Sequence, residues 1–476
     1  MSAAETENLH KIDHIVVVML ENRSFDHMLG YLSVEGGRPD VDGLAAGMAN
    51  QHAGHTYPVH HLPAGAFATG ALGPDHSGAG VARQVNGGRM DGFVAAYAEA
   101  LAGRGLGGVD PGPVMGYYGA EELPTYDHLA GEFTICDRWH SSVPGATWPN
   151  RLYALTGAAD GSHDDRPVLP LYDKHSFVRH LDAAGVSWKW YSYAPGTLRC
   201  VDGEYLVGRH EHFAFVDRVK LRWPTVIEES VTIDAGSASF LEDAVRGDLA
   251  AVSWIDPNFY ALDLVGSPSN DDHPPSDVAE GQELVFRIYN ALATGPKWDK
   301  TLLVVVYDEH GGFHDHVAPP EAPDDDPEGF GRYGVRVPAL IVSPWAAPGA
   351  VSHTLFDHTS VIKTIMERFC SDELVHHHGI DALKHWLERG HPHYLGRRVE
   401  AATGLGQLLS EPRARPAPDR GALGRRLAGT RAELAAAAVR SPPSARAADW
   451  PVTDLQLGMA AAAEHFRQHG LPHGQP

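Results

Sequence analysis

Two short stretches of this chain are almost purely apolar, rich in valine, and end abruptly in acidic residues. The first is residues 12–20 (IDHIVVVML), which Glu21 and Asn22 follow. The second is residues 301–307 (TLLVVVY), which two further acids follow. A β-branched run without alternation is typical of a strand buried on both faces of a parallel sheet. Because helices must cover both faces of such a sheet, the two runs predict an α/β fold.

Other expected strands and helices alternate along the chain. Strands are expected at residues 133–137, 186–191, 250–255 and 337–343, and helices at 90–101, 149–156, 176–184, 281–294 and 359–369. This alternation predicts a mainly parallel, doubly wound sheet. Most of the stretch before residue 110 carries no periodic pattern and is expected to form long loops.

The chain is expected to divide into one large domain and a tail. Residues 1–396 hold the alternating pattern, whereas Ala, Arg and Pro dominate from about residue 397 and no strand pattern appears there. We therefore expect one large α/β domain over 1–396 and a helical or partly mobile appendage over 397–476, without a role in catalysis.

The composition limits the partners and the compartment. A formal net charge of -23, from 38 Lys+Arg against 61 Asp+Glu, disfavours nucleic acid and anionic bilayers as partners. Three distant cysteines do not predict a disulfide framework or a thiolate metal site. Residues 1–11 are polar and acidic, and the following apolar run is too short for a signal sequence or a membrane anchor. The sequence as written predicts a cytoplasmic protein, or a secreted or periplasmic one if a leader was removed.

Acidic side chains follow three of the expected strands. They are Glu21 with Asn22, Asp256, and Asp308 with Glu309. In open parallel sheets ligands bind outside the carboxyl ends of the strands, so these side chains are expected at one edge. Carboxylate and amide oxygens suit a divalent cation. The alternatives are an ordinary capped strand-to-helix turn at the first position and a solvated acidic loop at the last.

Two further features offer groups for phosphoryl chemistry. Thr147 lies on a turn (PGATWPNR, residues 144–151) before an expected helix, where a helix dipole favours an incoming anion and a neighbouring metal would stabilise an alkoxide. The alternative is that Thr147 only caps the helix. His76 and His273 each follow acids in a loop, and either could bind a phosphate oxygen or protonate a leaving alkoxide.

Six segments share their order and residues with a known family. They are residues 12–32 (IDHIVVVMLENRSFDHMLGYL), 86–94 (NGGRMDGFV), 143–157 (VPGATWPNRLYALTG), 271–282 (DDHPPSDVAEGQ), 307–320 (YDEHGGFHDHVAPP) and 356–365 (FDHTSVIKTI). Together they resemble the bacterial and plant phosphoesterase family, which contains non-specific phospholipases C and a related acid phosphatase. That family belongs to the alkaline phosphatase-like superfamily.

The resemblance implies a fold, a cofactor and a mechanism. The fold is an alkaline phosphatase-like three-layer α/β/α sandwich with a mainly parallel central sheet. One divalent ion (Mg²⁺, Ca²⁺, Mn²⁺ or Zn²⁺) would lie at the sheet edge, and Thr147 would form a phosphothreonine intermediate. The implied metal ligands are Glu21, Asn22, Asp308 and Glu309, and the implied active-site histidines are His76 and His273.

Two more residues are expected to contact substrate. Asn150 lies in the same motif as Thr147, and His212 falls near a further family histidine, with His210 as the alternative. The resemblance implies a phosphate ester as substrate, either a phospholipid or a soluble monoester or diester. A sulfatase is disfavoured because threonine cannot yield formylglycine. A catalytically inactive homologue that binds metal or phosphate stays open as an alternative.

Overall fold

The computed structural model describes residues 3–63, 66, 73–165, 172–193, 196–206, 209–217, 239–259, 269–274, 278–371 and 395–440. One sheet lies at the centre of this part of the chain. Its strands are β1 (His14–Leu20), β6 (Thr134–Cys136), β7 (Trp188–Ser192), β8 (Phe213–Phe215), β9 (Val252–Ile255), β10 (Thr301–Tyr307), β11 (Ala339–Val342) and β12 (Val351–Ser352). They are arranged in the order β12-β6-β11-β10-β1-β9-β7-β8. The two apolar runs of the sequence are thus neighbours at the centre of the sheet.

The sheet is mainly parallel, as predicted. β1 pairs in parallel with β10 and with β9, and its last residue, Leu20, is level with Tyr307 of β10. β11 is the exception, because it runs antiparallel to both β10 and β6. The connection from β10 to β11 contains one short helix, α12 (Pro327–Phe330), and no crossover to the far edge, so the chain re-enters the sheet in the reverse direction.

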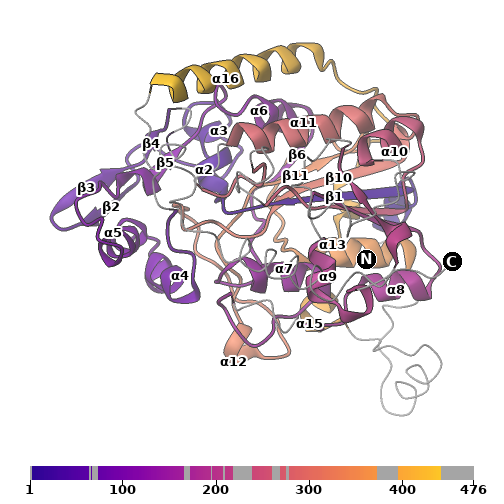
Figure 1. Ribbon diagram of the computed structural model, residues 1–476, viewed down its shortest axis with the longest axis horizontal. Coiled ribbons are helices and arrows are strands. Elements are labelled where there is room, and N and C mark those ends of the chain that lie inside the picture. Colours follow the sequence, from indigo (N-terminus) through magenta and orange to yellow (C-terminus); the bar gives the residue numbers. More distant parts are fainter. Residues whose placement is uncertain are drawn as a thin grey trace, which may run out of the picture.

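Helices cover both faces of the sheet (Figure 1). One face carries α6 (Pro124–Glu132), α10 (Phe240–Arg246) and α11 (Val278–Thr294), and the other carries α7 (Thr147–Thr156), α8 (Val178–Ala183), α9 (Thr197–Val201) and α13 (Thr359–Phe369). Every residue of β10, and every residue of β1 after His14, is buried. This burial on both faces explains why the two runs are apolar without alternation, and it confirms the three-layer α/β/α architecture.

The stretch before residue 110 is more ordered than the sequence predicted. The expected helix is α5 (Phe93–Gly103), and the structure adds α2 (Phe25–Leu29), α3 (Tyr31–Val34), α4 (Gly78–Val85) and a hairpin of β2 (Ala49–His52) and β3 (His55–Pro58). The hairpin and α5 project together from one side of the molecule (Figure 1). The hairpin was not predicted because its strands are polar and partly exposed, so they lack a buried apolar face.

Residues 395–440 pack against both helical layers and contain no strand. α15 (Arg397–Ala401) contacts α13, and α16 (Gly421–Arg440) contacts α11 and α6. Arg426 and Arg431 of α16 pair with Asp127 of α6 and Glu280 of α11 at 3.0 and 2.9 Å. Residues 441–476 of the expected appendage lie outside the described residues.

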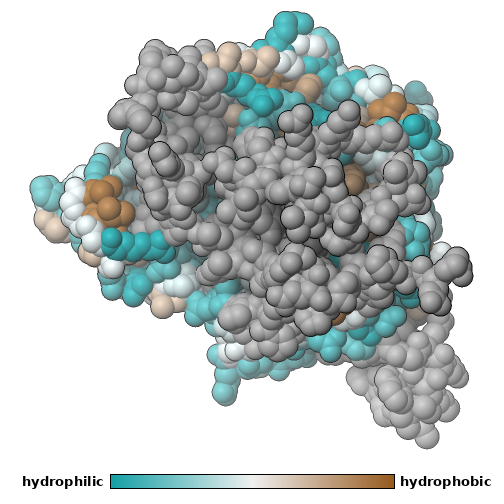
Figure 2. All heavy atoms as spheres, in the orientation of Figure 1, coloured by the Kyte–Doolittle hydropathy of each residue, from teal (hydrophilic) through white to brown (hydrophobic). Residues whose placement is uncertain are grey.

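The described surface in view is mostly hydrophilic, with small hydrophobic patches (Figure 2). The large hydrophobic side chains exposed among the described residues are Leu106, Val109, Val245 and Leu355. None of the helices in the described ranges is both long and apolar enough to span a membrane. The three cysteines are buried, and none of them forms a disulfide.

Candidate active site

The acidic strand ends meet at one edge of the sheet, as predicted. β10, β1 and β9 are adjacent and parallel, so the residues that follow them leave the sheet on the same side. Arg151 of α7 lies among these acids. Its Nε donates to Asp308 Oδ2 at 3.0 Å, and its Nη2 is 3.6 Å from Glu21 Oε1. The charge of Asp256 also acts on this guanidinium, so all three strand ends face one buried cation.

The backbone after β1 adopts an unusual conformation that fits the loop after β10. Asn22 has a φ of +61°, a left-handed value that asparagine tolerates better than most residues, and its N–H donates to Asp308 Oδ1 at 3.3 Å. Gly311 lies directly against this turn. A Cβ on Gly311 would come within 2.2 Å of the Asn22 carbonyl oxygen, so the loop after β10 can pack this closely against Asn22 only with glycine at this position.

Negative charge exceeds positive charge at this edge. Glu21, Asp271, Asp308 and Glu309 are all fully buried, and among the described residues Arg151 is the cation that contacts Glu21 and Asp308. Burial raises the pKa of Glu21 well above its ordinary value, and the charges of Asp271 and Asp308 raise it further. Burial and the charge of Asp308 raise the pKa of Glu309 in the same way.

Several oxygens at this edge accept no hydrogen bond from the described part of the chain. They are both carboxylate oxygens of Glu21, Oδ1 of Asn22, Oε1 of Glu309 and Oδ2 of Asp271. A buried carboxylate without a partner is destabilising unless a cation compensates it. The donor set is made of hard oxygens and carries excess negative charge, so it fits a divalent cation.

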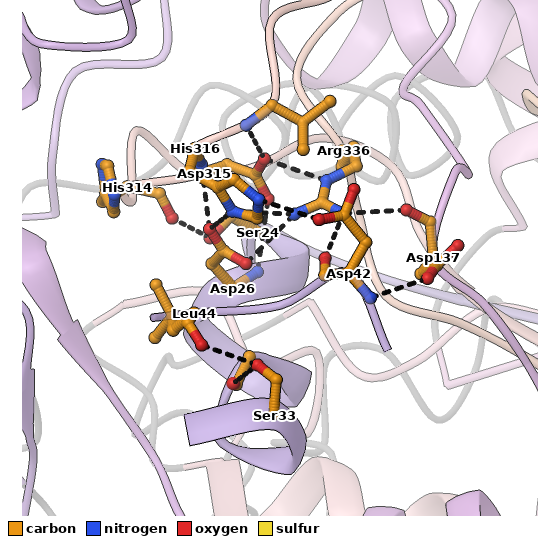
Figure 3. A network of polar contacts seen from close by, with 12 residues as sticks. Ser24, Asp26, Ser33, Asp42, Leu44, Asp137, His314, Asp315, His316 and Arg336 are labelled. Carbon is orange, nitrogen blue, oxygen red and sulfur yellow. Dashed lines mark hydrogen bonds and ion pairs between the residues drawn. The ribbon is translucent and has the colours of Figure 1, made fainter. Parts of the chain in front are cut away.

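A second group of acids lies close by but is already neutralised (Figure 3). The possible ligand atoms of Asp26, Asp315 and His316 lie within 4.8 Å of one another. Arg336 donates to Asp26 Oδ1 at 3.0 Å and to Asp315 Oδ1 at 2.9 Å, and His316 Nδ1 is 2.7 Å from Asp26 Oδ2. Every carboxylate oxygen of Asp26 and Asp315 accepts a hydrogen bond, so this group fits a metal ion less well than the edge that carries Glu21.

Thr147 is the first residue of α7 and is almost fully buried. Arg151 lies four residues later, so Thr147 shares the helix face that contacts Glu21 and Asp308. The next backbone N–H, that of Trp148, donates to Asp165 Oδ1 at 2.6 Å. The turn before Thr147 requires Gly145, because a Cβ there would come within 2.2 Å of the His163 carbonyl oxygen.

Asn150 supports this turn from within. Its Nδ2 lies within hydrogen-bond distance of the carbonyl oxygens of Val143, Gly145 and Ala146, at 3.3, 3.1 and 3.0 Å, and its Oδ1 accepts from the Val143 N–H at 3.0 Å. The side chain is fully buried. The structure therefore places Asn150 where it shapes the turn that holds Thr147, and its expected contact with substrate stays a prediction.

His76 and His273 lie together beside Asn22. Their ring centroids are 5.9 Å apart, and Asn22 Nδ2 is 3.4 Å from His76 Nδ1. Burial and the neighbouring His76 lower the pKa of His273 to about 3. His273 Nδ1 is 2.6 Å from the Pro274 carbonyl oxygen, which fixes the proton on that nitrogen. His273 is therefore neutral, whereas His76 is only half-buried.

His212 is not brought to this edge. It stacks on Trp188 with ring centroids 4.2 Å apart, and its Nδ1 is 2.9 Å from the Trp188 carbonyl oxygen. His212 directly precedes the edge strand β8. When the strand pairings are followed from β8 through β7 and β9 to β1, its position corresponds to that of Val16. Glu21 is five residues further along β1, about 16 Å at the usual rise per residue, and three strands away. The side chain of His210 lies outside the described residues.

Two residues at the edge were not predicted from the sequence. Arg151 follows Thr147 by one helical turn, and this spacing is the signal that could have identified it. Asp271 immediately precedes the Asp272-His273 pair, and its carbonyl oxygen accepts the Glu21 N–H at 2.8 Å. A run of two acids before a histidine gave no reason to prefer one acid over the other.

A family model and the similar proteins of known name agree on the family to which this chain is similar. The model of the Phosphoesterase family matches residues 12–370. Non-specific phospholipase C6 of Arabidopsis thaliana is 32% identical over 385 residues, which cover 75% of this chain and 68% of that protein. Phospholipase C B of Mycobacterium tuberculosis is 33% identical over 405 residues, or 76% of this chain and 74% of that protein.

More distant similarities come from solved structures. A protein in the alkaline phosphatase superfamily from Vibrio parahaemolyticus is 13% identical, with 54% of this chain and 62% of that chain covered and a TM-score of 0.32. Phosphonate monoester hydrolase of Agrobacterium radiobacter is 12% identical, with 75% and 73% covered and a TM-score of 0.33. Similarity of this degree bears on neither activity nor ligands.

Proposed function

This chain belongs to the Phosphoesterase family and is a hydrolase of phosphoric ester bonds; from that premise we propose that it uses one divalent metal ion and a covalent phosphothreonine at Thr147. The observation that carries the proposal is the excess of buried negative charge at the edge where β1 and β10 end, with carboxylate oxygens to which no described residue donates a hydrogen bond. Thr147 lies on the helix face that contacts this edge.

The metal ion would be held by Glu21, Asn22, Asp308 and Glu309. When bound, such an ion offsets negative charge on the phosphoryl group and lowers the pKa of a nearby hydroxyl. Hard oxygen ligands favour Mg²⁺, Ca²⁺ or Mn²⁺ over a softer ion. The chain's own contribution is a buried set of charges placed before the substrate arrives, which is the main source of catalysis in phosphoryl transfer.

Thr147 is the nucleophile in the proposed reaction. Its Oγ1 passes its proton to solvent and attacks phosphorus as the bond from phosphorus to the leaving alcohol breaks, which gives a phosphothreonine and an alkoxide. Water then attacks the same phosphorus as the bond to Oγ1 breaks; a proton of this water passes to Oγ1, which restores the Thr147 hydroxyl and releases the phosphate product. The N-terminus of α7 favours the anionic group through its dipole. Asn150 keeps Thr147 in place through its bonds within the turn.

We assign protonation of the leaving alkoxide to His76. His273 is the weaker candidate because its pKa is lowered to about 3, so near neutral pH its only proton is the one on Nδ1, which faces the Pro274 carbonyl oxygen. His273 can instead accept a hydrogen bond on Nε2, since Nδ1 faces the Pro274 carbonyl oxygen. His76 lies beside Asn22 and is half-buried, so its ring is next to the proposed metal site.

The substrate class follows from the relatives, which are named phospholipases C, so we propose a phosphodiester of that type. A soluble phosphate ester is the second candidate. It is favoured by the net charge of -23, which opposes docking on an anionic bilayer, and by the scarcity of exposed hydrophobic side chains among the described residues. Turnover of p-nitrophenylphosphorylcholine and of p-nitrophenyl phosphate distinguishes a diesterase from a monoesterase: the first substrate should be preferred, and preference for the second favours a soluble monoester as the substrate.

Thr147→Ala tests the nucleophile. When a reaction with a substrate radiolabelled at phosphorus is quenched with acid, the wild-type chain should retain the label as phosphothreonine. The variant should show neither this label nor turnover, while its metal content after dialysis stays the same. Thr147→Ser is the matched control, because it keeps the hydroxyl and should retain both labelling and measurable turnover. Turnover by Thr147→Ala would show that another group attacks phosphorus.

A further inference from the structure

Arg336 is a fully buried arginine that lies outside the proposed metal site and binds residues near both halves of it (Figure 3). It precedes β11, and its guanidinium donates from Nη2 to Asp26 Oδ1 at 3.0 Å and from Nε to Asp315 Oδ1 at 2.9 Å. Asp26 lies four residues after Asn22, and Asp315 lies six residues after Glu309. One guanidinium therefore joins the segment that continues from β1 to the segment that continues from β10.

The two segments are also bound directly to each other. The Asp26 N–H donates to Asp315 Oδ2 at 3.3 Å, and the His316 N–H donates to Asp26 Oδ2 at 2.8 Å. Ser24 Oγ donates to the His314 carbonyl oxygen at 2.6 Å. The first two bonds use Oδ2 of Asp315 and Oδ2 of Asp26, the carboxylate oxygens that Arg336 does not bind. The distance between the two segments is therefore fixed by direct bonds as well as by Arg336.

The guanidinium is itself fixed to the body of the protein. Its Nη1 donates to the carbonyl oxygens of Asp42 at 2.7 Å and of Asp137, which follows β6, at 2.8 Å. It lies over the ring of Phe25, 4.6 Å from the centroid, and the Phe25 N–H donates to the Arg336 carbonyl oxygen at 3.2 Å. Arginine suits this place because its planar fork satisfies four acceptors in fixed directions, which a lysine ammonium cannot do.

We propose that Arg336 is a positioning residue for the metal site, which holds the Glu21-Asn22 pair and the Asp308-Glu309 pair at the spacing that a divalent ion requires. The inference rests on the proposed function, because it assumes that these four residues bind the ion. It goes beyond that function in placing part of the metal affinity on a residue that touches neither metal nor substrate. Substitution of residues that orient metal ligands commonly lowers affinity about 10- to 100-fold.

The test compares Mn²⁺ binding by the full chain and its Arg336→Lys variant, both stripped with a chelator and titrated calorimetrically with Mn²⁺ alone. The variant keeps the charge and loses the fork, so its Mn²⁺ affinity should fall about 10- to 100-fold. Activity at limiting Mn²⁺ should fall with it, whereas kcat at saturating Mn²⁺ should recover most of the wild-type value. An unchanged affinity in the folded variant would overturn the proposal.

The matched control is Arg179→Lys. Arg179 of α8 also binds a buried carboxylate with its fork, that of Asp202, with Nε at 3.1 and 3.0 Å from the two oxygens. It lies away from the strand ends that carry the acids, so the control should lower the melting temperature without changing Mn²⁺ affinity. Equal loss of affinity in both variants would show a general effect of stability and would also overturn the proposal.

Two more variants separate this inference from the proposed function. Glu309→Gln should abolish tight Mn²⁺ binding; if it does not, the proposed metal site is wrong, whatever Arg336 does. Asp26→Asn weakens one bond to Arg336 and keeps the shape of the side chain, so it should give a smaller loss of affinity than Arg336→Lys, and it replaces that variant if the lysine form does not fold. If Glu309→Gln still binds Mn²⁺ tightly and Asp26→Asn does not, the ion is bound by Asp26, Asp315 and His316. That result would overturn the proposed role of Arg336.

Discussion

Asp271→Asn should stabilise the metal-free protein and weaken the metal-loaded one. Asp271 is fully buried beside Glu21, and its Oδ2 accepts no hydrogen bond within the described ranges. Its charge raises the pKa of Glu21, so the two carboxylates repel each other when no cation is bound. An amide of the same shape removes the charge, keeps an oxygen for the His273 N–H, and offers Glu21 a donor.

The size of the effect follows from the pKa of Asp271. Burial raises this pKa from an ordinary 3.8 to about 7. At 1.36 kcal/mol per unit, ionisation of Asp271 in the metal-free fold costs about 4 kcal/mol above pH 7. With an unfolding entropy near 2.1 cal/mol/K per residue, a chain of this length gains about 4 °C in melting temperature if the whole cost is removed.

The assay is thermal unfolding at pH 8 with chelator and with saturating divalent metal. The variant should melt at a higher temperature than the wild type in chelator, and its advantage should shrink or reverse with metal. Asp256→Asn is the control. Asp256 is also buried at this edge, but it accepts from Trp190 Nε1 at 2.6 Å and from the Thr197 N–H at 2.7 Å, so its loss should destabilise both forms by about 1–3 kcal/mol. A metal-free Asp271→Asn that melts below wild type would refute the idea of uncompensated charge.

Two further predictions concern the surroundings of the site. Burial lowers the pKa of His316, but its hydrogen bond and charge interaction with Asp26 outweigh burial and raise it to about 9. Since the unfolded value is near 6.5, the stabilisation should be complete below pH 6.5 and lost as the pH rises through 9, a slope in melting temperature that His316→Asn should flatten. Gly145→Ala should lower kcat and reduce the free energy of unfolding by about 1–3 kcal/mol, seen as a lower melting temperature, because its Cβ would meet the His163 carbonyl oxygen. Gly131→Ala has open space at its Cβ, so it should leave kcat and the melting temperature unimpaired.

The central strands and main helices could be predicted because each carries its own apolar pattern. β1 and β10 are buried on both faces, and α11 and α13 have regular apolar spacing, so local sequence was sufficient. β8 and β12 have three and two residues, too few to show any period. The reversed direction of β11 was not predictable either, because strand direction depends on the path of the connection and not on the residues of the strand.

The residues of the candidate site also divide into those that local sequence could identify and those that depend on how distant segments pack. Glu21 and Asp308 could be assigned because a strand end is visible in sequence and parallel strands end at one edge. Arg151 and Asp271 escaped notice because their places depend on how α7 and the 269–274 segment pack across that edge. Arg336 has no local motif at all: its partners come from four separate segments, and only the folded chain brings them together.

The position of β1 also has a consequence for how this protein is made. β1 is complete by residue 20, but its two neighbours in the sheet, β9 and β10, are residues 252–255 and 301–307. At ribosomal rates of about 5–20 residues per second, this apolar strand waits roughly 15 to 60 s for the partners that bury it. Contacts so distant in sequence also slow the search for the native pairing once synthesis ends. We therefore expect nascent chains to depend on chaperones until β10 has emerged, and fragments that stop before residue 300 to aggregate rather than fold.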